Sequence, residues 1–451
     1  MNMTTMTYPS ESPVTGRRSP VAGQDSVLVI GAGLAGLTAA WQALGRGRKV
    51  RVIAMGWGAL YWHAGCVDVL GYYPLESAEP VASAAESLAQ LMADNPQHPY
   101  ALAGLESLDE ALRAFQALCG EYGYPLHGSL ERNWLLPSAV GTFRPTCLAP
   151  ETMIAGDLSD KAPMLIVGFK QLGDFYANVV ADNLMQQGVP AQSLTLDLPT
   201  LRARNFTTPV LLADMMDRAD FRAEVVAAVR PHLGQAERIG FPAVLGTERP
   251  LQVKQDLETN LGRPVFEIPG LPPSVPGIRL FRILRDKIEQ SGGQVYDGMQ
   301  AVAATHENGR VTAVYTEAAA RQRRHRYDQF VLATGGILGG GIRANHKGEV
   351  CEAVFDLPVT APASQLDWFK RDFLDREGHP IYQAGLTVNE HFQPLDNQRL
   401  DNQRLYGNRR PLYDNLFAVG TTLAHCEVIR ERSFDGVGLV TGYAVGKVVG
   451  D

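Results

Sequence analysis

The chain has 451 residues, 45% of them hydrophobic, and a formal net charge of −7. This length and apolar content are enough for a sizeable core divided over two or three structural units. The negative charge argues against a nucleic-acid partner and against broad electrostatic binding to an acidic membrane.

The cysteines are sparse and widely spaced, and no two of them form a C-x-x-C pair. We therefore expect neither an iron–sulfur cluster nor a structural zinc site in this chain, and no other metal site. Such thiols fit a reducing cytoplasm. The five positions are Cys66, Cys119, Cys147, Cys351 and Cys426.

The first 25 residues are rich in Thr, Ser and Pro and contain no apolar run, so we expect a disordered leader. No segment of the sequence approaches the roughly 20 apolar residues that a membrane-spanning helix needs. We therefore expect any membrane association to occur through a partner.

A glycine-rich loop follows the first apolar strand, Val27–Ile30. A helix over Leu34–Leu44 and a second strand over Lys49–Met55 complete a βαβ unit around this loop, as dinucleotide binding requires. The helix N-terminus offers free N–H groups and a positive dipole to a phosphate. The loop has the pattern G-x-G-x-x-G and consists of Gly31, Ala32, Gly33, Leu34, Ala35 and Gly36.

The second strand lacks the carboxylate that usually binds the adenosine ribose. It ends in Ala54-Met55-Gly56, and no acidic residue occurs from Ser26 to Val67. NADP would need Arg48 or Arg51 to meet its 2′-phosphate, although both arginines are better explained as solvated charges. FMN ends in a single phosphate and needs no ribose acid, so we predict FMN, with FAD as the alternative.

The middle of the chain shows further α/β patterning, with a buried strand at 164–169, a helix within 174–188 and another strand within 237–246. We interpret this region as a cap domain that covers the cofactor. The tandem sequence LDNQRLDNQRL at 395–405 has no apolar periodicity and is interpreted as a loop expansion.

Two later segments repeat the arrangement of an apolar strand followed by glycine. A helix over Phe281–Gln290 and a hairpin turn at Asn308-Gly309 precede the strand Phe330–Ala333, and a third strand covers Leu416–Val419. A closing helix is expected over 436–450. The residues expected at the cofactor are Thr334, Gly335 and Gly336 after the second strand, and Gly420 and Thr421 after the third.

The predicted fold class is α/β, with a Rossmann-like flavin-binding domain assembled from discontinuous segments and an inserted α/β (α+β) cap domain. The expected boundaries are a leader at 1–25, flavin-binding parts at 26–75, 281–345 and 410–451, a cap or substrate domain at 76–280, and a cap segment with a variable loop at 346–409.

The spread of these segments resembles two-domain flavoproteins of the succinate dehydrogenase and fumarate reductase type. Four stretches, at 63–70, 138–150, 165–175 and 267–284, are similar to the B subunit of anaerobic glycerol-3-phosphate dehydrogenase. The resemblance runs from about residue 26 to the end, and the element LPPS…GIRL at 271–280 is its most specific part.

The resemblance implies an FMN-containing protein that works with a second flavoprotein, the A subunit of the complex, and with an iron–sulfur protein, its C subunit. Such a complex oxidises sn-glycerol 3-phosphate to dihydroxyacetone phosphate and passes the electrons to quinone. It further implies a cytoplasmic chain, peripheral to the inner face of the cell membrane through its partner subunits.

Oxidising a secondary alcohol through a flavin requires a base, and a phosphorylated substrate requires cationic anchors. Of the histidines considered as bases, His63 and His425 follow strand-to-glycine segments that should border the cofactor. Arg144 and Arg279 lie among Gly and Pro in loops and are candidates for bidentate phosphate binding. For all four, a structural role is the alternative.

Two other function classes stay open from the sequence. One is a self-sufficient FAD-dependent enzyme of the fumarate reductase or ketosteroid dehydrogenase type, and the other is a non-catalytic scaffold with a degenerate nucleotide fold. Turnover by the chain alone would favour the first, and a yellow purified protein would exclude an empty scaffold.

Overall fold

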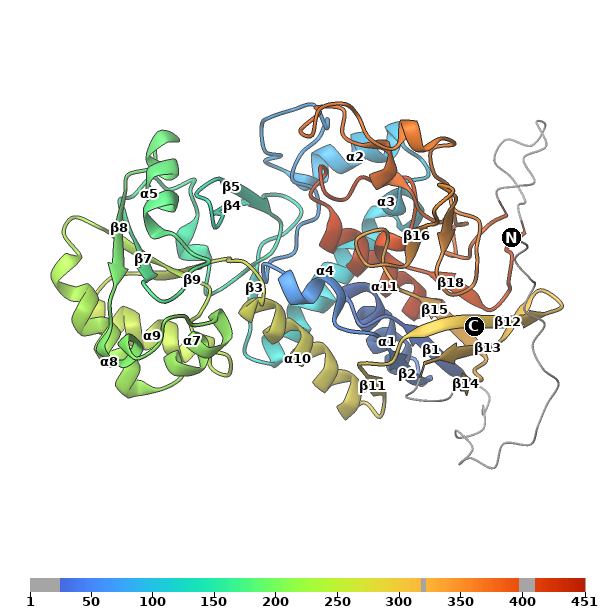
Figure 1. Cartoon of the computed structure of the whole chain (residues 1–451), viewed down its shortest axis with the longest axis horizontal. Coiled ribbons are helices and arrows are strands. Elements are labelled where there is room, and N and C mark those ends of the chain that lie inside the picture. Colours follow the sequence, from blue (N-terminus) through green and yellow to red (C-terminus); the bar gives the residue numbers. More distant parts are fainter. Residues whose placement is uncertain (1–24, 318–321, 397–409, 451) are drawn as a thin grey trace.

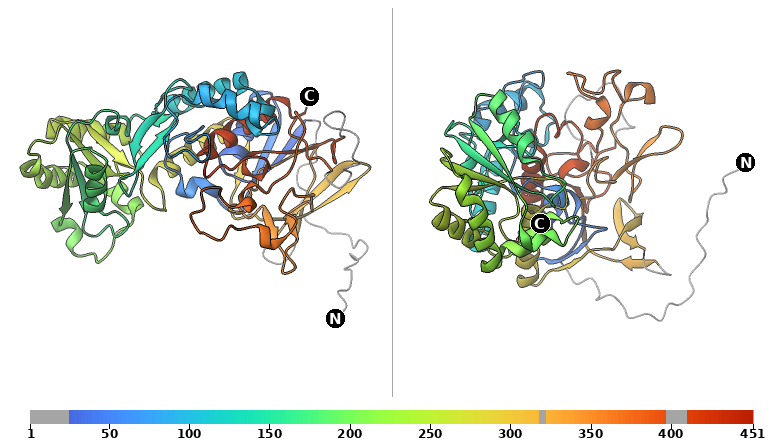
Figure 2. Two further views of the ribbon diagram at one scale, coloured as in Figure 1. Left: turned by 90° about the horizontal axis from the view of Figure 1, so that it is seen from above. Right: turned by 60° about the vertical axis from the view of Figure 1, so that its left-hand side comes forward.

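The computed structural model describes residues 25–317, 322–396 and 410–450. Two lobes lie side by side in Figures 1 and 2, and one of them brings together the beginning and the end of the chain. The predicted leader, apart from Asp25, and most of the tandem sequence at 395–405 lie outside the described residues.

The first lobe is built on a five-stranded parallel sheet with the order β11-β2-β1-β15-β18. Its central strand, β1, is completely buried, which explains its continuous apolar sequence. The three strand-to-glycine segments predicted from the sequence supply adjacent strands, β1, β15 and β18. The strands are β1 Ser26–Ile30, β2 Lys49–Ile53, β11 Gln294–Tyr296, β15 Gln329–Leu332 and β18 Leu416–Ala418.

Two glycine-containing helices, α1 (Leu34–Gly45) and α11 (Phe434–Val448), pack closely beside this sheet. A Cβ atom on Gly442 would lie 2.3 Å from the carbonyl oxygen of Ala35, so the two backbones are in direct contact there. The predicted closing helix is therefore confirmed, and glycine is required where it meets α1.

An antiparallel sheet of three strands follows β11 in the first lobe, and the predicted hairpin at Asn308-Gly309 is confirmed. Both turn residues have positive φ, 50° and 74°, as expected for a tight hairpin turn. The strands are β12 Ala301–Glu307, β13 Arg310–Thr316 and β14 Arg323–His325.

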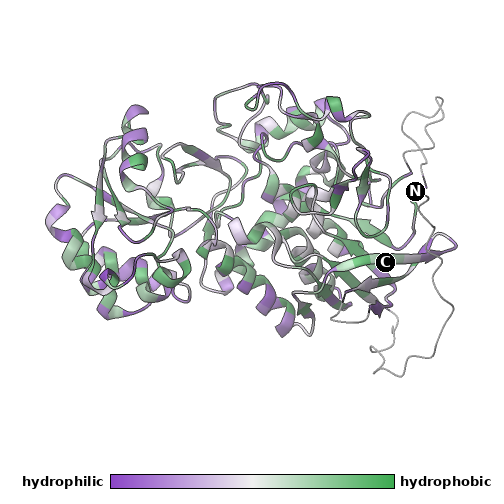
Figure 3. Ribbon diagram, in the orientation of Figure 1, coloured by the Kyte–Doolittle hydropathy of each residue, from purple (hydrophilic) through white to green (hydrophobic). Residues whose placement is uncertain are grey.

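The second lobe has its own parallel sheet, with the order β10-β9-β7-β8, and its own apolar core. Apolar residues, green in Figure 3, follow the inner elements of both lobes. The strands are β7 Met164–Phe169, β8 Ala191–Leu196, β9 Arg238–Pro242 and β10 Val265–Ile268, and the helices are α5 Ala177–Gln186, α6 Pro199–Arg202, α7 Pro209–Met216, α8 Ala219–Val229 and α9 Pro250–Leu261.

The segment between the two sheets packs on the first lobe. Its apolar residues from Ala84 to Leu148 belong mainly to the core of that lobe, whereas residues 158–275 form the core of the second. The cores change near residue 150 and not near the boundary expected at 76. The elements are α2 Ala84–Asp94, α3 Pro99–Ala103, α4 Leu105–Glu121, β3 Leu126–His127, β4 Trp134–Pro137, β5 Phe143–Thr146 and β6 Ala149–Pro150.

The helix expected over Phe281–Gln290 is longer than predicted. It is α10, Val275–Gln290, and it begins directly after Ser274, whose Oγ accepts a hydrogen bond from the N–H of Gly277 at 3.0 Å. Pro276 is tolerated because the first turn of a helix needs no donor from that nitrogen. A short hairpin, β16 (Ile342–Ala344) and β17 (Val350–Glu352), completes the strands.

In the part of the chain that the structure describes, no helix is long and apolar enough to cross a lipid bilayer.

Candidate functional site

A cavity of about 390 Å³ lies at the carboxyl ends of the strands β1, β15 and β18. This is the edge of an open parallel sheet at which ligands bind, and the volume lies within the range of small-molecule sites. All three glycine segments reach the cavity. The predicted cofactor residues that line it are Gly31, Ala32, Gly33, Leu34, Ala35, Thr334, Gly335, Gly420 and Thr421, whereas Gly36 and Gly336 support the wall from behind.

The three glycines of the first loop differ in the space that surrounds them. Gly31 has a φ of 121°, and a Cβ atom there would lie 2.1 Å from the carbonyl oxygen of Ala333. A Cβ atom on Gly36 would lie 2.1 Å from the carbonyl oxygen of Gly31. Gly33, the N-cap of α1, has ordinary extended backbone angles, and its Cβ would meet no atom within 4 Å. The fold therefore requires Gly31 and Gly36, whereas Gly33 leaves free space at a helix N-terminus that suits a phosphate.

Hydrogen bonds fix the second and third glycine segments. The N–H of Gly336, in the second segment, donates to Oγ1 of Thr421, in the third, at 3.1 Å. The N–H of Gly420, also in the third segment, donates to Oγ1 of Thr441 in α11 at 2.9 Å. The buried hydroxyl of Thr334, which lines the cavity, has no hydrogen-bond partner among the described residues. Because a buried polar atom is normally satisfied, this hydroxyl fits a polar ligand in the cavity.

The cavity lining extends beyond the glycine segments. It includes Ala54, Met55 and Gly56, directly after β2, and Gln300, directly before β12, and none of these carries a carboxylate. A further part of the lining, called the aromatic wall below, consists of Tyr61, Trp62, Leu338 and Phe434. Arg343 is the one charged side chain among the described residues that line the cavity.

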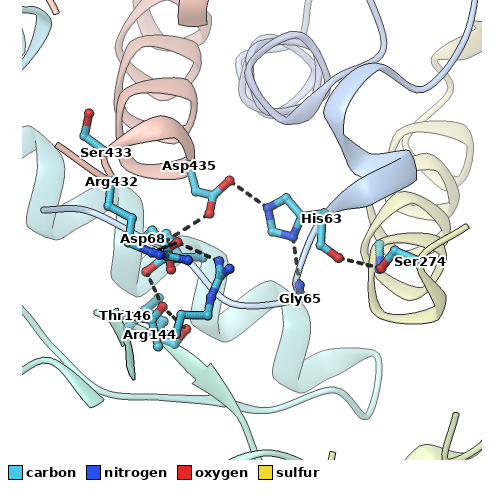
Figure 4. A network of polar contacts seen from close by, with 12 residues as sticks. His63, Gly65, Asp68, Arg144, Thr146, Ser274, Arg432, Ser433 and Asp435 are labelled. Carbon is cyan, nitrogen blue, oxygen red and sulfur yellow. Dashed lines mark hydrogen bonds and ion pairs between the residues drawn. The ribbon is translucent and has the colours of Figure 1, made fainter. Parts of the chain in front are cut away.

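His63 directly follows Trp62 in the chain but does not line the cavity, and Figure 4 shows its ring between Gly65 and Asp435. Its Nδ1 accepts a hydrogen bond from the N–H of Gly65 at 3.0 Å, so the ring proton is assigned to Nε2. Nε2 lies 2.8 Å from Oδ1 of Asp435 in the first turn of α11. Burial raises the pKa of Asp435, but His63, the N–H of Asp68 and the charge of Arg144 together outweigh burial, and the pKa lies below its usual value.

Arg144 belongs to the same buried network. Its Nη2 lies 2.6 Å from Oδ2 of Asp68, and the Nε of Arg432 lies 3.1 Å from the same oxygen. The N–H of Asp68 donates to Oδ2 of Asp435 at 3.1 Å, which joins this cluster to His63. Two of the four candidate catalytic residues are thus brought together, through two carboxylates that connect them.

Arg279 lies outside the cavity in a buried ion pair. Its Nη1 and Nη2 lie 2.7 and 2.9 Å from the two carboxylate oxygens of Glu267, and its Nε and Nη2 donate to the carbonyl oxygen of Gly246. Because Nε, Nη1 and Nη2 of the guanidinium already donate to these groups, this placement does not favour the expected phosphate contact. We therefore assign Arg279 a structural role in connecting α10 to the second lobe.

His425 also lies outside the cavity lining. Its Nε2 is 3.0 Å from Oγ1 of Thr387, and its carbonyl oxygen accepts from Nδ2 of Asn95 at 2.7 Å. Burial, with a smaller contribution from His98, lowers the pKa of His425. These contacts indicate that His425 holds neighbouring segments together.

Sequence reasoning missed several residues that the fold places at or behind the cavity. Asp435 lies in the first turn of α11, after the N-cap Ser433. An acidic residue at this position ordinarily interacts with the helix dipole, so the sequence did not mark it as a partner of His63. Arg343 closely follows Gly339-Gly340-Gly341, and this glycine run was the available signal for it. Nothing in the local sequence marks Asp68 or Arg432 as partners of Arg144.

Comparisons with known proteins show the family to which the chain belongs. Residues 26–432 match a family described as an FAD binding domain. A protein of Halobacterium salinarum, named as the B subunit of a probable anaerobic glycerol-3-phosphate dehydrogenase, is 33% identical over 439 residues, which cover 94% of this chain and 98% of that protein. A protein of Pectobacterium atrosepticum, named as the B subunit of anaerobic glycerol-3-phosphate dehydrogenase, is 29% identical over 435 residues, with coverage of 94% and 98%.

Among solved structures, a 3-ketosteroid Δ1-dehydrogenase from Sterolibacterium denitrificans aligns with 95% of this chain and 100% of its own, at 11% identity and a TM-score of 0.43. A likeness this weak carries no argument about function.

The family match supports a flavin cofactor, but it does not support the preference for FMN, because the matching family is one of FAD binding. The resemblance noted in the sequence is confirmed over nearly the whole chain. The chain therefore belongs to the FAD-binding family of flavoproteins and, within it, to the family of the B subunits of anaerobic glycerol-3-phosphate dehydrogenase.

Proposed function

We propose that this chain is a flavin-carrying redox subunit of a respiratory anaerobic glycerol-3-phosphate dehydrogenase. Together with a second flavoprotein and an iron–sulfur protein, the A and C subunits of the complex, it oxidises sn-glycerol 3-phosphate to dihydroxyacetone phosphate and delivers the electrons to quinone. The observation that carries the proposal is the cavity at the three glycine segments, in a chain that aligns over 94% of its length with proteins named as the B subunits of this enzyme.

We infer that the flavin is FAD. The cavity continues past the phosphate loop to Ala54, Met55 and Gln300, where an adenosine half would lie, and FMN would leave that part of the cavity unfilled. In this arrangement the backbone at Gly33 and the N-terminus of α1 would hold the phosphates, and the hydroxyl of Thr421 would be available to the flavin's sugar-alcohol chain.

When bound, the flavin supplies hydride and electron transfer. The residues of this chain bind and orient it. Tyr61, Trp62 and Phe434 line part of the cavity, with Tyr61 and Trp62 about half exposed to solvent, and the His63–Asp435 pair joins the two segments that carry them. Arg343 provides a positive charge for an anion in the cavity.

The location proposed for the chain follows from this assembly. It lies in the cytoplasm on the inner face of the cell membrane and reaches the membrane through its partner subunits.

The test is to express the chain alone and together with the flavoprotein and iron–sulfur partners of the same organism, and to measure glycerol 3-phosphate oxidation with a soluble quinone analogue. We expect turnover by the complex and less than about a hundredth of that rate by the chain alone, because quinone reduction is assigned to the iron–sulfur partner. Full activity of the chain alone would refute the proposal and favour a self-sufficient enzyme. A purified chain without any flavin would favour a scaffold.

The identity of the flavin is tested separately. The protein is denatured, and the mass of the released yellow compound is measured. A stoichiometric yield of FAD is expected, and a stoichiometric yield of FMN would refute the inference about the adenosine half of the cavity.

A further inference from the structure

The part of the cavity wall that directly follows β2 lacks the side chain that usually holds an adenosine ribose. In dinucleotide-binding folds this side chain is an acid at the end of the second strand. Here Ala54, Met55 and Gly56 follow β2 and line the cavity, and none of them has a polar side chain. Because ribose hydroxyls that leave water need a hydrogen-bonding partner, another segment has to supply it for FAD to bind here.

A neighbouring segment brings one amide to this part of the cavity. Strand β11 pairs with β2 in parallel (Figure 1), and beyond β11 the N–H of Met299 donates to the carbonyl oxygen of Ala54 at 2.7 Å. The next residue, Gln300, lines the cavity. Its own carbonyl oxygen accepts a hydrogen bond from the N–H of Glu317 at 3.0 Å. The backbone of this segment is therefore fixed, and Gln300 directly follows the contact with Ala54.

The side-chain amide of Gln300 is available to a ligand. Gln300 is half-buried, and its amide has no hydrogen-bond partner among the described residues. An amide has an oxygen that accepts and an NH2 group that donates, so it can pair with both hydroxyls of a ribose. The residues on either side of it, Met299 and Ala301, also line the cavity but are apolar. Within this segment, Gln300 therefore provides the side chain that can replace the missing acid.

We propose that Gln300 binds the ribose of FAD and that this contact makes the cavity selective for FAD over FMN. The proposal rests on the proposed function, because it takes FAD as the cofactor. FMN shares the flavin ring, the sugar-alcohol chain and one phosphate with FAD but has no adenosine. A contact with the ribose therefore stabilises bound FAD alone, whereas contacts at the glycine segments stabilise both flavins.

The test compares Gln300→Leu and Gln300→Glu in the full chain. Leucine is similar in size but forms no side-chain hydrogen bonds, whereas glutamate keeps acceptor oxygens and restores an acid. The matched control is Gln252→Leu, at an exposed position of α9 in the second lobe. The flavin is removed from each protein, and the affinities for FAD and for FMN are measured by fluorescence titration, beside a thermal melt of the flavin-free protein.

The expected result is a loss that is specific for FAD. Two hydrogen bonds between neutral groups correspond to roughly fivefold to 150-fold in affinity. Gln300→Leu should therefore lose at least about fivefold in affinity for FAD and keep the parent's affinity for FMN. Gln300→Glu and Gln252→Leu should stay within about threefold of the parent for both flavins, and all melting temperatures should match that of the parent.

Several outcomes would overturn the proposal. Parent-like FAD affinity of Gln300→Leu would do so, and so would an equal loss for FAD and FMN, which would mean that the side chain only shapes the cavity. An equal loss of FAD affinity in Gln300→Glu would assign the amide to the adenine ring and overturn the ribose contact. If the parent binds FMN as tightly as FAD, the inference that the flavin is FAD fails first and this proposal fails with it, whereas tight FAD binding that is insensitive to Gln300 refutes this proposal alone.

Discussion

Replacing Gly33 by alanine should separate flavin binding from folding, because the added methyl group points into the cavity and not into the protein. A Cβ atom on Gly33 meets no atom within 4 Å, and the backbone angles of −77° and 178° are ordinary for an L-residue. Alanine is a poorer N-cap than glycine, but it reduces the freedom of the unfolded chain. These effects are each about 1 kcal/mol or less and oppose each other, so the melting temperature of the flavin-free protein should stay within about 4 °C.

Flavin binding should respond much more strongly to the same change. The methyl group occupies the space in which a phosphate approaches the N-terminus of α1. The loss of one charge-assisted hydrogen bond there costs about 1.5–3 kcal/mol, which weakens the affinity roughly tenfold to 150-fold. The assay is titration of the flavin-free protein with FAD, followed by fluorescence, beside a thermal melt.

Gly45 provides the matched control. It lies at the other end of α1, and a Cβ atom there also meets nothing within 4 Å. Gly45→Ala should leave both the melting temperature and the FAD affinity close to those of the parent. If Gly33→Ala keeps the affinity of the parent, the glycine loop does not hold the phosphate and the reasoning is refuted. Gly36→Ala, by contrast, should destabilise the fold itself, because its Cβ would lie 2.1 Å from a backbone oxygen.

Three further predictions concern buried ionisable residues outside the cavity lining. Arg279→Met should destabilise the protein by about 3–5 kcal/mol in urea unfolding, because it leaves Glu267 buried without its partner; an unchanged midpoint would refute the structural role. Asp435→Asn should lower the free energy of unfolding by about 1–3 kcal/mol and weaken FAD binding, because Nε2 of His63 no longer faces a charged carboxylate. Parent-like FAD affinity would contradict the positioning role of this pair. Burial raises the pKa of Glu352 from 4.5 to about 7, so the folded protein keeps a proton that the unfolded chain releases, and stability should fall on the order of 3 kcal/mol as the pH rises from about 4.5 to 7. Glu352→Gln should flatten this pH dependence, and an unchanged slope would exclude Glu352 as its cause.

Much of the first lobe was predictable from local sequence because its elements carry their own signals. Continuous apolar runs followed by glycine identified β1, β15 and β18 as buried strands, but the local sequence does not give their order in the sheet. The hairpin at Asn308-Gly309 was predictable because both residues tolerate positive φ. The boundary between the two lobes was harder to predict and was expected near residue 76, whereas the cores change near residue 150. Amphipathic helices such as α2 and α4 can cover either core, and only tertiary contacts decide which one.

The candidate catalytic residues were harder to place for a different reason. A histidine or arginine in a glycine-rich loop has the same local sequence whether it faces a ligand or a buried carboxylate. Arg279 and Glu267 are twelve residues apart and pair inside the fold, whereas Arg144 meets Asp68 from another part of the chain. Sequence reasoning could identify these residues as well positioned, but the identity of the partner depends on long-range contacts that leave no local pattern.

The missing ribose carboxylate favours FMN more strongly than the family match supports. FMN follows from this absence only if a side chain at the end of β2 must hold an adenosine. In the fold, the N–H of Ala54 donates to the carbonyl oxygen of Tyr296 at 2.9 Å, and the N–H of Met299 donates to the carbonyl oxygen of Ala54 at 2.7 Å. These bonds bring Gln300, from a segment far along the chain, to the same end of the cavity. An adenosine can therefore be bound there by an amide and by backbone groups, and the absence of an acid at the end of β2 does not exclude FAD.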